Sequence, residues 1–340
     1  MKKAAVTIKD VSAKCGLSVS TVSKALNNYD DISPETRELV HRMAREIGYH
    51  PSAVARTLKT NHSYNLGVLF HEASDQGITH HFFAAILNAF KQAGEERGYD
   101  ITFITHNIGG RAMTYLEHCL YRNVDGVCVV CADYYNPEVQ ELSRSGIPCV
   151  TIDHVYPSCA CVLSENEEGI RMLVEKAASL GHKRIAYAFG QPSLVTEKRI
   201  SGFRSAMQEL GLPVPDEYVT PCCYTSPESG FESMKRLMSL PEPPTCVLMS
   251  DDHTALGALN AAEEMGLRVP EDVSIGGFDG IRLTQMLTPR MTTIRQDTDR
   301  IGREAAALLV DLIQNDARRA SAISVPTGLI DGQTIGPVKG

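Results

Sequence analysis

The chain contains no tryptophan, and Phe, Trp and Tyr together make up only 6% of its 340 residues. Any aromatic wall of a binding site must therefore come from Phe or Tyr. No apolar run approaches the ~18 residues that a membrane helix needs. The start of the chain, "MKKAAVTIKDV", has two lysines but no apolar segment long enough for a signal peptide. We therefore expect a cytoplasmic protein without a membrane partner.

Sequence motifs of catalysis and metal binding are also missing. There is no Gly-x-Ser-x-Gly elbow, no Gly-x-x-x-x-Gly-Lys loop and no His-Glu-x-x-His pair. Nothing at zinc-like spacing surrounds the cysteine pairs at positions 128 and 131, 159 and 161, and 222 and 223. In a reducing compartment such cysteines are small apolar core residues. We therefore expect that the protein is not an enzyme and binds neither a cofactor nor a metal ion.

The charge is distributed unevenly along the chain. Residues 1–62 carry ten Lys and Arg against six Asp and Glu, whereas the whole chain has a net charge of −8. A basic head on an acidic body is typical of a nucleic-acid reader joined to a sensor domain. The alternative is a small solvated helical extension.

The same head predicts three short capped helices. The expected starts are Thr7, Ser18 and Ser33-Pro34, and the expected ends are Gly16, Asn27 and Gly48. Ser and Thr satisfy free amides at a helix start, Pro suits the first helical position, and Gly tolerates the left-handed conformation at the end. Two helices joined by a tight Gly-containing turn, with a third as a brace, predict a helix-turn-helix headpiece over residues 1–50.

A hinge follows at residues 51–62, where residues 51–58 have the composition of a two-turn helix. So short a helix is marginal in water, so we expect it to order only when something holds it. Leu58, an apolar residue in a polar linker, is a candidate wedge for a minor-groove base step. The alternative is that Leu58 rests on the neighbouring domain.

Residues 7–58 resemble the headpiece and hinge of the LacI family of bacterial transcription regulators. The resemblance rests on "TIKDV", "GLSVSTVSKALN", "SPETRELV" and "GYHPSAVARTL". It implies that Val19, Ser20 and Lys24 face base edges. It also implies DNA contacts for Tyr49 at the hinge entrance, for the hinge residues Ala55, Leu58 and Lys59, and for the phosphate-facing residues Thr7, Ser18, Thr21, Ser23 and Asn27. Lys24 replaces an Arg that is common in the family, which leaves a point charge instead of a bidentate fork.

From residue 64 onward, strand and helix patterns alternate. Apolar strand candidates lie at 65–70, 100–105, 124–130, 147–153, 183–189, 245–250 and 273–278. Helical patterns lie between them, at 82–97, 167–180, 201–210 and 254–265. This alternation predicts an α/β body with parallel sheets covered on both faces. We expect two doubly wound subdomains with a cleft between them.

The resemblance to the LacI family extends over this body. It implies a periplasmic-binding-protein-like domain over 63–340, for effector binding and dimerisation, in which the chain crosses between lobes near 162, 292 and 322. The N-subdomain would comprise about 63–162 and 293–321, and the C-subdomain about 163–292 and 322–340.

Polar and aromatic residues follow the predicted strand ends, where ligands of open α/β sheets bind. An Arg with several carboxylates and an aromatic wall suits a neutral ligand rich in hydroxyls. The family resemblance marks Arg199 and Asp279 as the closest matches to effector contacts. The other candidates are Phe82, Phe83, Asp153, Tyr224 and Asp251. Asp251 stands where the family usually has Asn, so no relative's ligand can be transferred.

These features predict a ligand-gated homodimeric repressor that binds a pseudo-palindromic operator. The effector would be a sugar or a related small polar metabolite. The first alternative is control by a protein partner, as in the catabolite-control branch of the family. The second is a solute-binding protein, which shares the body but should have a signal peptide and no basic head.

Overall fold

The structure is a computed structural model that describes residues 6–50, 62–71, 77–315 and 321–338. It divides into two compact units, residues 1–64 and residues 65–340, which we call the headpiece and the α/β unit. Each is described by itself. Among the described residues, no helix has both the length and the apolar composition needed to cross a membrane.

The headpiece contains α1 (Ile8–Cys15), α2 (Val19–Leu26) and α3 (Pro34–Glu46). The predicted helix starts are confirmed, whereas α2 and α3 end one and two residues before the predicted ends. Gly48, the expected end of α3, lies beyond it with a φ of 71°. The three helices enclose a small core made of Val11, Val22, Ala25, Val40 and Ala44.

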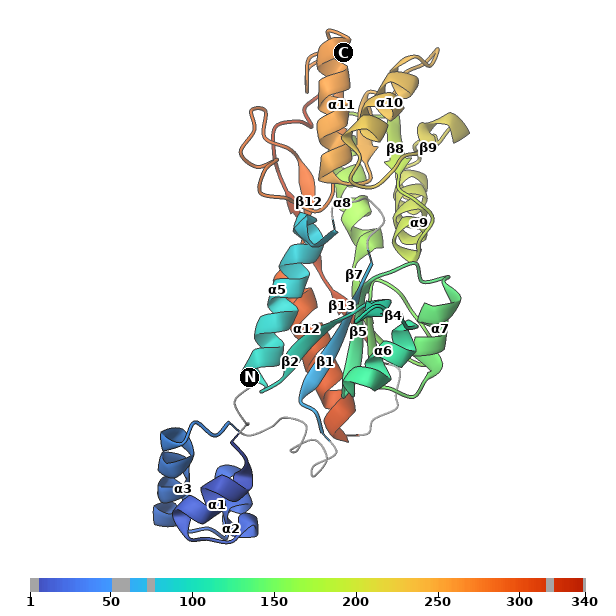
Figure 1. The fold of residues 1–340 in the computed structure, drawn as a ribbon. Coiled ribbons are helices and arrows are strands. Elements are labelled where there is room, and N and C mark those ends of the chain that lie inside the picture. Colours follow the sequence, from blue (N-terminus) through green and yellow to red (C-terminus); the bar gives the residue numbers. More distant parts are fainter. Residues whose placement is uncertain (1–5, 51–61, 72–76, 316–320, 339–340) are drawn as a thin grey trace. The chain divides into compact units, whose positions relative to one another are not determined.

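The first lobe of the α/β unit is built on a six-stranded sheet in the order β13-β7-β6-β5-β1-β2, with every pairing parallel. Its strands are β1 (Asn65–Phe70), β2 (Asp100–Ile104), β5 (Gly126–Cys131), β6 (Cys149–Ile152), β7 (Ala160–Ser164) and β13 (Ala322–Val325). The two sides of the sheet pack into separate apolar clusters. One cluster includes residues of α5 (His81–Glu96) and α12 (Thr298–Asn315), and the other includes residues of α6 (Tyr115–Arg122) and α7 (Pro137–Arg144). Figure 1 shows these two pairs of helices on opposite sides of the sheet.

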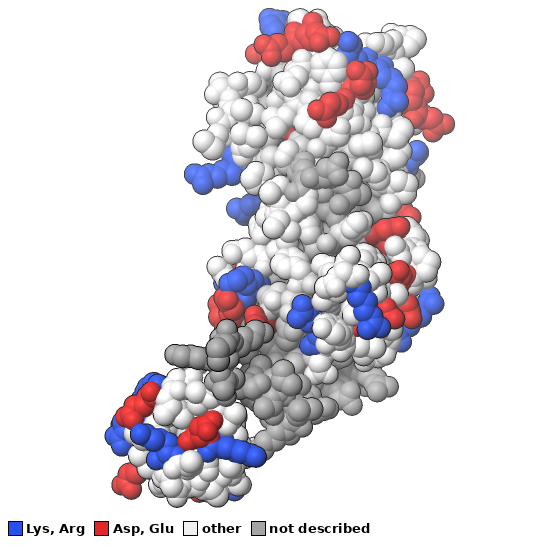
Figure 2. Space-filling model, in the orientation of Figure 1, with Lys and Arg blue, Asp and Glu red and all other residues white. Residues whose placement is uncertain are grey.

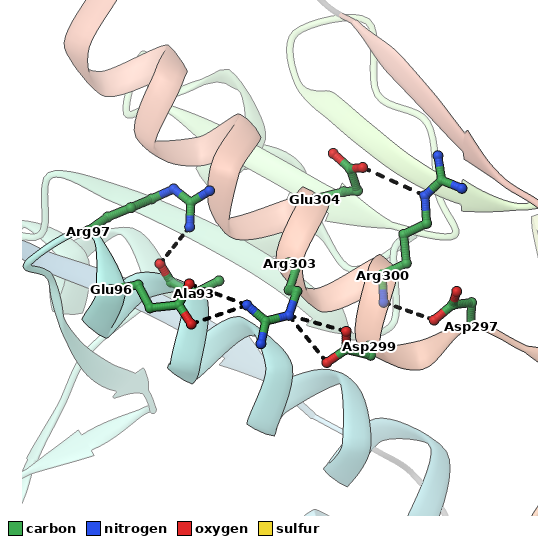
Figure 3. A network of polar contacts seen from close by, with 8 residues as sticks. All are labelled: Ala93, Glu96, Arg97, Asp297, Asp299, Arg300, Arg303 and Glu304. Atoms are coloured by element: carbon green, nitrogen blue, oxygen red, sulfur yellow. Dashed lines mark hydrogen bonds and ion pairs between the residues drawn. The ribbon is translucent and has the colours of Figure 1, made fainter.

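Helices α5 and α12 lie side by side although more than 200 residues separate them in sequence. A Cβ atom at Gly302 would lie 2.4 Å from the carbonyl oxygen of Ile86, so only glycine permits this approach. Arg303 of α12 links the pair at the surface by donating to Glu96 of α5 at 3.2 Å and to Asp299 at 3.1 Å (Figure 3). Exposed ion pairs contribute at most about 1 kcal/mol each, so the close packing dominates.

The second lobe contains a four-stranded parallel sheet in the order β11-β10-β8-β9. Its strands are β8 (Ile185–Phe189), β9 (Val219–Pro221), β10 (Cys246–Met249) and β11 (Ser274–Gly276). Helices α8 (Asn166–Ser179) and α9 (Leu194–Glu209) cover one face, and α10 (Pro227–Met238) and α11 (Asp252–Glu264) cover the other (Figure 1). The antiparallel pair of β12 (Thr293–Gln296) and β14 (Thr327–Ile330) completes this lobe. The predicted parallel α/β architecture is confirmed.

Smaller elements complete the α/β unit. They are the hairpin of β3 (Asn107–Ile108) and β4 (Arg111–Ala112), and the 3-10 turns η1 (Gly77–Thr79) and η2 (Asp216–Tyr218). None of them carries a predicted site residue.

One local prediction was wrong. Helix α9 starts at Leu194, not at 201, because Ser193 caps it and accepts a hydrogen bond from the Thr196 amide. The sheet of the first lobe extends to Val325, close to the crossing predicted near 322, because β13 pairs with β7 from Ala322 to Val325.

The cysteines lie mostly in the cores of the two lobes. Cys128 and Cys246 are fully buried in central strands, and this burial raises the pKa of both thiols. Among the described residues, no group of His, Cys, Asp and Glu has the arrangement of a metal site.

Candidate DNA-binding surface and effector site

The predicted base-reading residues lie on α2, on the surface of the headpiece. Val19 is 40% exposed although it is apolar, and Ser20 beside it is exposed. Both side chains are thus available to a partner, as a base reader requires. Figure 2 shows Lys and Arg side chains on the visible face of the headpiece, interspersed with acidic ones.

The predicted phosphate-facing residues also organise the helix ends. Ser18 accepts from the Thr21 amide at 3.0 Å, and Asn27 donates to the Ser23 carbonyl at 2.7 Å. Thr7 donates to the Asp10 carboxylate at 2.8 Å through its hydroxyl. Tyr49 is half-buried against the headpiece core.

Lys24 has an unexpected neighbour. Its ammonium donates to the carboxylate of Asp31, in the loop between α2 and α3. A base-reading or phosphate-binding role for Lys24 therefore competes with an ion pair inside the headpiece. The hinge residues Ala55, Leu58 and Lys59 lie outside the described residues.

Arg199 is the central buried cation of the second lobe, and only 3% of it is exposed. Its Nε donates to the Asn166 side chain at 2.7 Å, and Nη1 donates to the Ser250 carbonyl at 2.8 Å. The guanidinium carbon lies 3.5 Å from the centroid of the Phe278 ring, a cation–π distance. These contacts fix the guanidinium and leave Nη2 for a further acceptor.

Two carboxyls, Asp153 and Asp279, lie close enough to Arg199 to interact with it electrostatically. Asp153 accepts from the Ser164 amide at 2.8 Å, and Asp279 accepts from the Gln296 side chain at 2.7 Å. Burial raises the pKa of both carboxyls, although Arg199 opposes the shift. Both residues have positive φ, 53° and 103°, a conformation that costs free energy in residues other than glycine and often occurs at functional sites.

The neighbouring acids Asp251 and Asp252 are both buried, and both accept hydrogen bonds from other residues. Asp251 caps α11 by accepting from the Thr254 amide at 2.8 Å, and it also accepts from the Thr225 amide at 2.7 Å. Asp252 accepts from the Ile281 amide and from the Thr284 hydroxyl, both at 2.8 Å. Burial raises the pKa of Asp252 to about 7.

The predicted aromatic contacts come from both lobes. Phe82 and Phe83, in the first turn of α5, pack edge to face at 5.2 Å. Tyr224 belongs to the loop between β9 and α10, and its hydroxyl lies 2.8 Å from the Thr196 hydroxyl. The imidazole of His81 stacks on that of His253 at 6.5 Å, joining the starts of α5 and α11. Among these rings, His81 and His253 make a contact that joins the two lobes.

Two family profiles match the chain. One, described as "Bacterial regulatory proteins, lacI family", matches residues 7–52, and the other, "Periplasmic binding protein-like domain", matches residues 174–335. The HTH-type transcriptional repressor PurR of Pectobacterium carotovorum subsp. carotovorum (strain PC1) is 33% identical over 336 residues, which cover 97% of this chain and 96% of that protein. PurR of Escherichia coli O139:H28 (strain E24377A / ETEC) is 35% identical over 337 residues, with the same coverage.

The chain belongs to the LacI family. Solved structures agree with this assignment. The lac repressor dimer bound to operator and the anti-inducer ONPF has a TM-score of 0.81 at 26% identity, covering 98% of this chain and 100% of that chain. A complex of the transcriptional regulator CelR with cellobiose has a TM-score of 0.72 at 28% identity, covering 97% and 99%. This LacI-family protein is a DNA-binding transcription regulator.

Sequence reasoning missed several residues of this LacI-family site. Asn166 and Phe278 hold the Arg199 guanidinium, yet neither was a candidate contact. Phe278 directly precedes Asp279, so its place after the last predicted strand was the available signal. Gln191 was also missed, because its side-chain oxygen accepts from the Tyr224 amide, which lies more than 30 positions away in the sequence.

Proposed function

We propose that this protein is a homodimeric repressor whose operator affinity is set by a small, neutral, hydroxyl-rich effector bound beside Arg199. The observation that carries the proposal is that Arg199 and the two carboxyls near it do not pair with each other directly. Within the described residues, the guanidinium of Arg199 forms no ion pair with Asp153 or Asp279, although all three interact electrostatically. Asp153 Oδ1 accepts from the Ser164 amide and Asp279 Oδ1 accepts from the Gln296 side chain, so both carboxyls are held in place beside Arg199.

This arrangement suits hydroxyl groups because each hydroxyl both donates and accepts. Arg199 Nη2 offers a donor, and the two carboxyls offer acceptors. Two carboxyls against one cation disfavour a phosphorylated or carboxylate effector, since a further anion would be repelled. Phe82, Phe83 and Tyr224 would cover the apolar face of the ligand.

Operator binding follows the two-fold logic of helix-turn-helix dimers. Each headpiece would place α2 in the major groove of one half-site, with Val19 and Ser20 at base edges. Leu58 would act as the minor-groove wedge at the operator centre. The variant Leu58→Ala should then weaken operator binding far more than nonspecific binding, and equal losses would contradict the wedge.

The first experiment is a ligand panel followed by melting temperature. Purified protein is mixed with ribose, cellobiose, other sugars, polyols, nucleobases and nucleosides. A ligand of the folded state stabilises it by about 2.7 kcal/mol at a hundredfold excess over its dissociation constant. A shift with a sugar or polyol that is smaller in Arg199→Lys at the same ligand concentration supports the proposal. A melting-temperature shift with nucleobases alone would show that the effector belongs to that class instead. No shift with any ligand of the panel would favour a protein partner.

A further inference from the structure

The loop that carries Tyr224 is anchored through the backbone amides of residues 222–225. The Cys222 amide donates to the Phe189 carbonyl at 2.6 Å, and the Cys223 amide donates to the Ser229 hydroxyl at 2.9 Å. The next two amides use side chains from elsewhere. Tyr224 donates to Gln191 Oε1 at 2.8 Å, and Thr225 donates to Asp251 Oδ2 at 2.7 Å. Four successive amides are therefore held from three segments, namely residues 189–191, Ser229 and Asp251.

The Tyr224 ring is confined as tightly as its backbone. A Cβ atom at Gly190 would lie 2.1 Å from Cε2 of the ring, so the ring lies against the bare backbone after β8. Its hydroxyl meets Thr196, whose own hydroxyl donates to the Gln191 carbonyl at 2.7 Å. Gln191 is thus linked to Tyr224 in two ways. Its side chain accepts from the Tyr224 amide, and its carbonyl accepts from Thr196, which contacts the Tyr224 hydroxyl.

Both oxygens of Asp251 accept hydrogen bonds from backbone amides, and this explains why the residue is not an asparagine. One oxygen caps α11 at Thr254, and the other accepts from Thr225, whose φ is 57°. An asparagine offers only one oxygen, so its NH₂ group would face one of these two amide donors. A carboxylate serves both at once, which joins the start of α11 to the loop.

We propose that Gln191 and Asp251 are positioning residues for the Tyr224 ring, and that Asp251 acts on the effector through this loop and not by contact. Gln191 and Asp251 set where the ring lies, and the ring sets one wall of the site. The consequence for effector affinity rests on the proposed function, whereas the anchoring of the loop does not.

Hydrogen exchange tests the anchor without any ligand. The exposed Gln191 is changed to Met, which keeps its length but removes the acceptor, and to Glu, which keeps the acceptor. Exchange of a peptide covering 222–226 is followed by mass spectrometry. Gln191→Met should speed exchange at the Tyr224 amide by roughly threefold to tenfold, the worth of one hydrogen bond, while Gln191→Glu stays near the parent. Gln208→Met, at an exposed glutamine of α9, is the matched control.

Equal exchange in Gln191→Met, Gln191→Glu and the parent would overturn the proposal. The second measurement uses whichever of cellobiose or ribose shifts the melting temperature. Its affinity should fall in Gln191→Met and be retained in Gln191→Glu. If neither sugar binds the parent but the exchange pattern holds, the anchor stands and the proposed effector class fails. Binding that is unchanged in Gln191→Met despite faster exchange would show that Tyr224 needs no positioning and would also overturn the proposal.

Discussion

The guanidinium of Arg199 lies 3.5 Å from the centre of the Phe278 ring, and this contact decides how the cation can be used. The ring covers the guanidinium while Asn166 and Ser250 take two of its donor nitrogens. A buried charge is tolerated only when such partners satisfy it. Arg199 is therefore fixed in place before any effector arrives, and fixed donors lose less freedom on binding.

The first prediction concerns this fixed cation. Arg199→Lys keeps the charge but loses the planar fork, so the effector should bind roughly 10- to 100-fold more weakly, the worth of one charged hydrogen bond. Operator affinity without effector should stay close to that of the parent, since Arg199 lies in the α/β unit. Calorimetry and operator gel shifts measure the two quantities.

Lys198→Met is the control for Arg199→Lys, because Lys198 is the adjacent residue of α9 and pairs with Glu167 at 3.4 Å. It should leave effector affinity unchanged. An Arg199→Lys protein that responds normally to the effector would remove Arg199 from the site.

The second prediction is a pH dependence of stability. Burial raises the pKa of Asp252 from 3.8 to about 7 in the folded state. The stability that protonated Asp252 contributes to the folded state is thus fully present below about pH 4 and is lost as pH rises through about 7. Asp252→Asn cannot titrate, so the parent should lose roughly 2–4 kcal/mol more unfolding free energy than this variant between pH 4 and 8.

Urea unfolding at several pH values checks this dependence. Asn also disturbs the hydrogen bonds to Asp252, so the test is the change with pH and not the absolute stability. The exposed Asp216→Asn should follow the parent at every pH. Parallel curves for the parent and Asp252→Asn would show that Asp252 is ionised throughout the range.

Much of the fold could be predicted because its signals are local. The headpiece helices start at Ser18 and Ser33, whose hydroxyls act on amides only three residues away. Buried parallel strands such as β5 are continuous apolar runs, which the sequence displays directly. Such features need no knowledge of the rest of the chain.

The features that could not be predicted depend on contacts between residues far apart in the sequence. The first turns of α9 look polar because Thr196 and Arg199 point inward, and their partners lie up to 51 positions away. β13 is a short edge strand that pairs, within the described part of the chain, with β7 alone, more than 150 residues earlier. The effector contact predicted for Asp251 from its place after a strand stays a prediction, but the structural role of this residue could not be foreseen. Its two amide partners include Thr225, 26 positions before it, which no local pattern indicates.

The third prediction concerns the headpiece ion pair. Asp31→Asn releases Lys24 and removes a negative charge beside it, so DNA affinity should rise about two- to fivefold, matching the ~0.5–1 kcal/mol of an exposed pair. The salt dependence of binding should also become steeper, by about one phosphate contact, if Lys24 then meets the DNA backbone. Fluorescence anisotropy with operator and random DNA measures both.

Asp30→Asn removes the same charge one residue away and separates general electrostatics from release of Lys24. Equal gains in the two variants would show that the pair with Lys24 has no specific effect. A gain for Asp31→Asn on operator DNA alone would identify Lys24 as a base reader.

The fourth prediction uses the absence of tryptophan from the chain. Tyr224→Trp introduces a single indole at the proposed aromatic wall, against the backbone of Gly190. Its emission should be shifted to the blue relative to a solvent-exposed indole, since the site is half-buried, and an effector should change both its wavelength and its access to acrylamide. Tyr121→Trp, at a residue of α6 that is 61% exposed, supplies the solvent-exposed reference. A ligand that raises the melting temperature yet leaves the emission of the Tyr224→Trp variant unchanged would bind elsewhere, because an indole in direct contact with a ligand cannot keep the same surroundings.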